Sequence, residues 1–262
     1  MSYTFYGRQN MICKVISHRG ANKHAPQNTL PAFEKSLEIV VDGFETDIHV
    51  TKDGVPVVCH NYTIDETSDG RGLIAEMTLE ELRGYDFGSY FSEKFAGTKI
   101  PTLEEFLTLC EGADIEILNI ELKSPKQGET GIVQKTIDAV KAHGLFDKLI
   151  ISSFDAKLLV EAKQTDPACK TGLLYSLQTF SSAKVFFTPV TYAASIKADA
   201  LHPHFIHVTP GYVYRAHKKG IKVNVWTVDK AFLARYLLLC GVDGIITNIP
   251  ELIKKVIAEK NK

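Results

Sequence analysis

Short runs of aliphatic and β-branched residues alternate with helix-like segments along almost the whole chain, and this alternation restricts the possible folds most strongly. Strands that alternate with helices favour a parallel sheet, because each parallel connection needs a crossover segment. The spacing favours a closed TIM (β/α)8 barrel, and a doubly wound open sheet is the alternative. The expected strands are Lys14–Ser17, Gly43–Val50, Ile115–Leu122, Leu149–Ser153, Thr171–Tyr175, Ile196–Ala200, Ile221–Thr227 and Gly244–Thr247.

Seven helices are expected between these strands, and two of them have recognisable start signals. Asn28-Thr29 supplies a capping side chain for the first helix. Thr102 followed by Glu105 forms a capping box for the second. The expected helices are Thr29–Val40, Leu103–Glu111, Ile132–His143, Lys157–Gln164, Thr209–Lys219, Lys230–Cys240 and Pro250–Ile257.

One interval, residues 61–100, interrupts the alternation. It is rich in Gly, Asp, Ser and Tyr and is too long for an ordinary loop between a strand and a helix. We expect an insertion over the C-terminal mouth of the barrel, where loops shape the active site. The domain prediction is therefore one barrel over residues 1–262 with an insertion at 61–100.

The charge balance and the cysteines limit the partners and the compartment. A net charge of −1 and a pI near 6.8 give no reason to expect nucleic acid or an anionic membrane as partner. Residues 1–17 lack the basic start and apolar core of a signal peptide, and no window approaches the ~20 apolar residues of a membrane span. Five scattered cysteines indicate reduced thiols. We predict a cytoplasmic protein, and nothing indicates its oligomeric state.

The first candidate for chemistry is His18-Arg19-Gly20, which follows the first expected strand. Catalytic groups of barrel enzymes lie at the C-terminal ends of the strands, so His18 and Arg19 are expected at the site. Gly20 allows a sharp backbone turn. The alternative is a strand-end histidine beside an ordinary surface arginine.

The second candidate lies on the next strand, where Glu45, Asp47 and His49 share one face. Two carboxylates on an inward face are costly unless a cation neutralises them, and oxygen ligands suit Mg²⁺ or Ca²⁺. Alternatively, Glu45 pairs with a buried lysine or arginine and Asp47 caps a turn. His49 is expected to be a hydrogen-bonded core histidine, or else to support a metal ligand.

A hairpin is expected to return a second histidine to the same mouth. Asp53-Gly54 is a tight-turn signal, and the strand after it leads to His60. Cleavage of a phosphodiester by acid–base catalysis needs one group to accept a proton and another to donate one, which two histidines can do. Cys59 is expected to point the opposite way and to serve in packing.

The third candidate is the strand that carries Asn119, Glu121 and Lys123 on one face. Glu121 can supply a third carboxylate to the ion, and Lys123 can hold a phosphate oxygen. The alternative is a Glu121–Lys123 pair at a solvated edge, against which the apolar neighbours of the strand argue.

Taken together and in this order, the motifs resemble those of the glycerophosphodiester phosphodiesterase family, and the likeness extends over nearly the whole chain. The matching positions are His18-Arg19-Gly20, Pro26-Gln27-Asn28-Thr29 with Phe33, Glu45-x-Asp47, Thr51-x-Asp53, Val57-x-x-His60-Asn61, Glu121-x-Lys123, Asn224-x-Trp226 and Asp243 to Pro250.

The resemblance implies a TIM barrel with an insertion, and metal-dependent hydrolysis of small glycerophosphodiesters to sn-glycerol 3-phosphate and an alcohol. It also implies a wall for the alcohol at Trp226, for which a core tryptophan is the alternative. The remaining implied residues are the metal ligands Glu45, Asp47 and Glu121, the catalytic pair His18 and His60, and the phosphate-binding Arg19 and Lys123.

Three positions depart from the family pattern by loss of a carboxylate: Gln27, Asn61 and Asn248. An amide at 61 can position His60 but cannot raise its pKa as a charge would. Two alternatives follow. One is a barrel that binds a phosphorylated ligand without turnover. The other is a phosphodiesterase for lysophospholipids, whose apolar rim would be Tyr85, Phe87, Tyr90 and Phe91.

Overall fold

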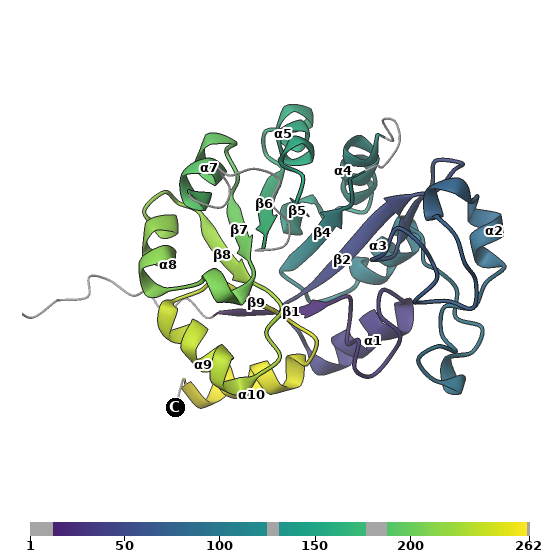
Figure 1. Cartoon of the computed structure of the whole chain (residues 1–262), viewed down its shortest axis with the longest axis horizontal. Coiled ribbons are helices and arrows are strands. Elements are labelled where there is room, and N and C mark those ends of the chain that lie inside the picture. Colours follow the sequence, from purple (N-terminus) through teal and green to yellow (C-terminus); the bar gives the residue numbers. More distant parts are fainter. Residues whose placement is uncertain (1–12, 125–130, 177–187, 261–262) are drawn as a thin grey trace, which may run out of the picture.

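The computed structural model describes residues 13–124, 131–176 and 188–260. The expectation about a signal peptide concerned residues 1–17, most of which lie outside the described residues. Eight parallel strands of this part form a closed barrel, because β1 pairs with both β9 and β2 (Figure 1). The prediction of a TIM barrel is confirmed, and the doubly wound alternative is wrong. The barrel strands are β1 Lys14–His18, β2 Gly43–Val50, β4 Ile117–Leu122, β5 Leu149–Ser153, β6 Lys170–Tyr175, β7 Ala200–Pro203, β8 Lys222–Val225 and β9 Gly244–Thr247.

Helices surround the barrel and cover its outer face, while α2 lies apart with the insertion (Figure 1). The described helices are α1 Leu30–Ile39, α2 Leu79–Arg83, α3 Leu103–Glu111, α4 Ile132–Ala142, α5 Ala156–Thr165, α7 Pro189–Ser195, α8 Pro210–His217, α9 Ala231–Cys240 and α10 Pro250–Lys260. Short 3-10 turns are η1 Ile74–Glu76, η2 Glu93–Phe95, η3 Phe146–Lys148 and η4 Phe205–His207. No helix among the described residues is long and apolar enough to cross a membrane.

Two local predictions were wrong. The strand expected at Ile196–Ala200 instead occupies Ala200–Pro203, because Ile196 caps the C-terminus of α7 and begins the turn that leads to the strand. The side chain of Thr29 makes no cap bond to α1; its hydroxyl donates to the Pro26 carbonyl at 2.5 Å. The capping box of Thr102 with Glu105 at the start of α3 is confirmed.

The hydrophobic core lies between the strands and the helices that cover them. Phe33 of α1, Phe44 of β2 and Phe106 of α3 are fully buried and meet with ring centroids 4.5–6.1 Å apart. Aromatic contacts of this kind add to the free energy of burial. Since Phe44 points outward into this cluster, its neighbour Glu45 points into the barrel.

The barrel interior is partly polar. His202 and Asn224 are buried there, and Asn224 Nδ2 lies 3.1 Å from His202 Nε2. Gly172 makes room for this imidazole, because a Cβ atom at that position would lie 2.7 Å from the His202 ring. Burial lowers the pKa of His202 to about 3, so this histidine packs as a neutral side chain.

The hairpin expected at Asp53-Gly54 is present. Strand β3, Pro56–Val58, pairs antiparallel with β2, and Gly54 has a φ of +83°. Residues 61–100 follow it and enclose a second hydrophobic cluster. Its buried members are Val57, Cys59, Ile64, Ile74, Leu82, Phe87 and Ile100. Cys59 therefore packs as expected, and burial raises the pKa of its thiol to about 11.

Candidate active site

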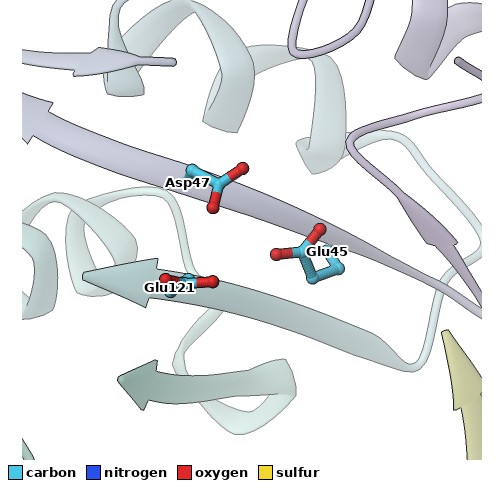
Figure 2. A group of neighbouring side chains, drawn as sticks. All are labelled: Glu45, Asp47 and Glu121. Carbon is cyan, nitrogen blue, oxygen red and sulfur yellow. The ribbon is translucent and has the colours of Figure 1, made fainter. Parts of the chain in front are cut away.

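Three carboxylates from the adjacent strands β2 and β4 meet inside the barrel (Figure 2). In the β2–β4 register, Asp47 pairs with Glu121 and Glu45 pairs with Asn119. Glu45, Asp47 and Glu121 are buried residues with at most 7% of their surface exposed, and each offers a carboxylate oxygen within 4.8 Å of the others. Parallel pairing thus brings together acids that lie 74 positions apart in sequence (121 minus 47).

Two cations enter this group of acids. Lys123 Nζ lies 2.7 Å from Asp47 Oδ1 and also contacts Glu121 Oε1. Arg19 Nε lies 3.4 Å from Asp47 Oδ2. The alternative in which Glu45 pairs with a buried lysine or arginine is therefore not what the side chains do, because Asp47 makes these pairs. The Glu121–Lys123 pair does form, but it is buried rather than placed at a solvated edge.

The electrostatics of the acids fit a bound divalent cation. Burial and the neighbouring charges of Asp47 and Glu121 raise the pKa of Glu45 well above its usual value. Burial likewise raises the pKa of Glu121 to about 7, although Lys123 opposes the shift. Burial alone would raise the pKa of Asp47, but Lys123 and Arg19 hold it well below its usual range. A further positive charge here would keep all three acids ionised, and an all-oxygen donor set suits a hard cation.

His18, the last residue of β1, lies beside these acids. Its Nε2 is 3.9 Å from Glu45 Oε2, and its Nδ1 is 2.7 Å from Asn248 Oδ1. Burial, and secondarily the charge of Arg19, lowers the pKa of His18 to about 3. The imidazole is therefore neutral near pH 7.

His60 is returned to the same end of the barrel by the hairpin. The preceding residue, Cys59, donates its backbone N–H to the Asp47 carbonyl at 3.0 Å. His60 Nδ1 lies 2.5 Å from Asn61 Oδ1, and burial lowers the pKa of His60. His49 Nε2 is 3.2 Å from the His60 carbonyl, so His49 supports the backbone next to a candidate catalytic residue.

The loop after β1 holds a residue that sequence reasoning took for a helix cap. Asn28 has a φ of +55°, and its Nδ2 donates to Asp47 Oδ2 at 2.9 Å. Its Oδ1 accepts a hydrogen bond from Thr46 Oγ1 at 3.0 Å. Asn28 therefore fixes the orientation of a candidate metal ligand. The available signal was its place in the Pro26-Gln27-Asn28-Thr29 motif.

Residues 18–252 match the sequence model of the Glycerophosphoryl diester phosphodiesterase family, which is nine-tenths of the chain. The chain belongs to the glycerophosphoryl diester phosphodiesterase family. The expectation drawn from its motifs is confirmed, and the protein is a phosphoric diester hydrolase.

Three similar proteins align with this chain over nearly their full length. The glycerophosphodiester phosphodiesterase of Caldanaerobacter subterraneus subsp. tengcongensis is 40% identical over 237 residues, covering 90% of this chain and 94% of the relative. An Oleispira antarctica phosphodiesterase, solved in complex with the product sn-glycerol-3-phosphate, superposes with a TM-score of 0.84 and 28% identity, covering 94% and 97%. A glycerophosphodiester phosphodiesterase from Parabacteroides distasonis gives a TM-score of 0.81 at 27% identity, covering 96% and 99%.

The three amides that depart from the glycerophosphoryl diester phosphodiesterase pattern all contact candidate site residues. Gln27 Oε1 accepts from Arg19 Nη1 at 2.8 Å, while Asn61 and Asn248 each bond a histidine. These amides therefore position Arg19, His60 and His18 by hydrogen bonds rather than by charge.

Trp226 directly follows β8 and is partly buried rather than a full core residue. Its Nε1 donates to the His202 carbonyl at 2.6 Å. Phe154 and His204 contact the indole edge-to-face, with ring centroids at 5.7 and 5.4 Å. The indole therefore lies at the end of β8 within an aromatic group.

Proposed function

We propose that the chain hydrolyses glycerophosphodiesters to sn-glycerol 3-phosphate and an alcohol, with a divalent cation on Glu45, Asp47 and Glu121. The observation that carries this proposal is the meeting of three buried carboxylates within 4.8 Å beside His18. The Oleispira relative, solved with sn-glycerol-3-phosphate, supports the choice of product.

Mg²⁺ or Ca²⁺ fits the donor set, because both ions prefer oxygen ligands. When bound, the ion supplies positive charge that stabilises the developing charge on the phosphate oxygens. The raised pKa values of Glu45 and Glu121 support this assignment, because a bound cation would favour the ionised form of both acids.

Arg19 and Lys123 are the proposed phosphate-binding residues. Both cations are held at the acids by Asp47, so their positions are fixed before substrate arrives. Burial would lower the pKa of Lys123, but Asp47 and Glu121 raise it above its usual value, and the ammonium stays charged. Preorganised cations of this kind stabilise charge that develops in the transition state.

His18 and His60 are the proposed proton-transfer residues. In each, Nδ1 is engaged by an asparagine oxygen, so Nε2 is the atom that exchanges protons with the substrate. Both imidazoles have lowered pKa values and are neutral near pH 7. One accepts the proton of the nucleophile, which is water or the glycerol 2-hydroxyl. The other first takes up a proton from solvent at Nε2 and then donates it to the departing alkoxide. Trp226 is the proposed wall for that alcohol.

The direct test is an assay of glycerophosphocholine cleavage with the chelated protein. We expect no turnover in chelator and restored release of choline after Mg²⁺, Mn²⁺ or Ca²⁺ is added separately. Cleavage at an undiminished rate in chelator would contradict the metal assignment. Binding of the diester without release of alcohol under any of these ions would favour the binding-only alternative.

A second candidate, a lysophospholipid substrate, rests on two exposed aromatic residues of the insertion. Tyr90 and Phe91 are 41% and 36% exposed. Of the four residues expected in the apolar rim, only these two are exposed. Phe87 is buried, and Tyr85 packs against the second hydrophobic cluster. A panel of glycerophosphodiesters and lysophospholipids decides between the two, with kcat/KM as the measure.

A further inference from the structure

Each candidate catalytic histidine is the first member of a series of three hydrogen-bonded side chains: a histidine, an asparagine and a carboxylate. In each chain the histidine Nδ1 faces an asparagine oxygen, and the nitrogen of that asparagine faces a carboxylate. The two chains are His18–Asn248–Asp229 and His60–Asn61–Glu66. The asparagines stand where the family pattern has carboxylates, whereas Asp229 and Glu66 have had no role so far.

In the first chain, a carboxylate decides which way the amide points. Asn248 Nδ2 donates to Asp229 Oδ2 at 2.6 Å. A carboxylate can only accept, so the amide nitrogen must face Asp229 and the amide oxygen must face His18. Asn22 Nδ2 also donates to this oxygen, at 2.5 Å, which agrees with the same orientation.

The orientation of the amide in turn decides the tautomer of His18. An amide oxygen accepts and does not donate, so His18 must carry its proton on Nδ1 to make the 2.7 Å bond. The lone pair is then on Nε2, the atom that lies 3.9 Å from Glu45 Oε2. A histidine base with the proton on the wrong nitrogen cannot act from that atom.

The two oxygens of Asp229 accept hydrogen bonds from different donors. Its Oδ1 accepts from the Asn248 backbone N–H at 2.9 Å and from Thr247 Oγ1 at 3.2 Å. This leaves Oδ2 for the Asn248 side chain. An amide at position 229 would keep its oxygen on the backbone N–H and present its nitrogen to Asn248.

In the second chain, Asn61 Nδ2 donates to Glu66 Oε2 at 2.8 Å, and Asn61 Oδ1 faces His60 Nδ1 at 2.5 Å. The logic is the same, but Glu66 is exposed on the insertion. Water competes for an exposed bond, so this carboxylate orients its amide less strongly than Asp229 does.

We propose that Asp229 and Glu66 are positioning residues, each of which fixes an asparagine amide so that the histidine beyond it presents Nε2 to the substrate. The inference builds on the proposed function, because it assigns His18 and His60 to proton transfer. Its structural part, the tautomer of His18, is independent of any activity.

The first test is Asp229→Asn, read by ¹⁵N NMR of histidine-labelled, metal-free protein, with the His18 signals identified by their loss in His18→Gln. We expect Nδ1 of His18 to carry the proton in the unsubstituted protein and Nε2 to carry it in D229N. We expect kcat of D229N to fall by roughly 10–100-fold, as when an orienting partner is lost, with little change in KM. An unchanged tautomer in D229N would overturn the proposal.

The second test is rescue by D229N combined with N248D. The carboxylate that this creates at position 248 accepts from His18 Nδ1 and from the new amide at 229, so the original tautomer and most of kcat should return. A double variant as impaired as D229N would mean that Asp229 acts only through the fold, and would overturn the proposal. Matching thermal unfolding curves of the three proteins verify that each is folded.

The exposed chain is tested by Glu66→Ala and Glu66→Gln, with Glu76→Ala as the matched control on the same insertion. We expect E66A to lower kcat by a few-fold, on the order of one weak hydrogen bond. E66Q should retain activity, because its exposed amide can rotate to offer an oxygen. An E66A protein as active as E76A would remove Glu66 from the proposal. If no diester is cleaved by the unsubstituted enzyme while D229N still shifts the tautomer, the proposed function fails and the positioning role of Asp229 remains.

Discussion

Asp47 of β2 and Glu121 of β4 are paired residues of adjacent parallel strands, and Lys123 contacts the carboxylates of both. The barrel interior therefore contains an ion pair and a candidate metal ligand set that share the same acids. Any change to one of these side chains should alter both the stability of the metal-free protein and its affinity for a cation.

Replacement of Lys123 by Met should destabilise the metal-free protein by up to about 3–5 kcal/mol, the cost of breaking a buried ion pair, because only Arg19 then remains as a cation beside the Asp47 carboxylate. Asp47 is fully buried and loses its 2.7 Å partner. A divalent cation should recover part of this loss, because it neutralises the same carboxylate. Urea unfolding in chelator and in Mg²⁺ measures both effects, and equal stability of K123M and the unsubstituted protein in chelator would contradict the prediction.

Affinity for the cation should rise with pH between about 5 and 8. Burial raises the pKa of Glu121 to about 7 and that of Glu45 well above its usual value, so protons occupy these acids below neutrality and the cation must displace them. Glu121→Gln should lower the affinity roughly tenfold or more and weaken its pH dependence. Calorimetric titration with Mn²⁺ at several pH values measures this, and a flat profile would rule out the linkage.

Replacement of either candidate catalytic histidine by Ala should lower kcat/KM by about 10²–10⁴-fold, the usual contribution of a proton-transfer group. His18→Ala and His60→Ala are compared on glycerophosphocholine at saturating metal. His143→Gln is the control, because that residue lies at the end of α4 and bonds Glu104 and Glu111. Turnover near the unsubstituted level in H18A or H60A would end the two-histidine mechanism.

The His143 side chain should also contribute to the stability of the protein in a pH-dependent way. The hydrogen bond that His143 donates to Glu104, and secondarily the one that it donates to Glu111, raise the pKa of His143 above its usual value. The folded state then binds this proton more tightly than the unfolded state, so the stabilisation is full below the unfolded pKa and disappears as pH rises through the folded pKa. The Tm deficit of H143Q should accordingly be larger at pH 6 than at pH 9. A deficit that grows with pH would reverse the assignment.

Gly20→Ala should destabilise the protein by more than about 1 kcal/mol, since it adds a collision to an unfavourable backbone conformation. Gly20 has a φ of +78°, and a Cβ atom there would lie 2.7 Å from the backbone carbon of Ala32. Gly97→Ala is the matched control, because Gly97 has a φ of +82° and nothing within 4 Å of such an atom. Chemical denaturation of the two variants should separate strain from collision, and equal costs would show that the contact with Ala32 relaxes.

Much of the fold and the candidate site could be predicted because the relevant signals are local. Alternation of strand and helix patterns predicted the barrel, and the two-residue period of a strand placed Glu45 with Asp47 and Glu121 with Lys123 on common faces. The turn chemistry of Asp53-Gly54 predicted the hairpin. Prediction failed at the strand Ala200–Pro203, which was expected to begin at Ile196. Ile196 instead caps the C-terminus of α7.

The sequence alone determined which side chains share a strand face, because that depends only on neighbours along the chain. Tertiary structure decided which faces meet: the β2–β4 register sets Asp47 opposite Glu121, and closure of the barrel brings His18 within 2.7 Å of Asn248. Tertiary structure also decided that Asn28, expected to cap a helix, donates a hydrogen bond to Asp47, and that Asn248 donates one to Asp229. These contacts join residues that no local pattern relates, since they arise only when distant strands hydrogen-bond and the barrel closes.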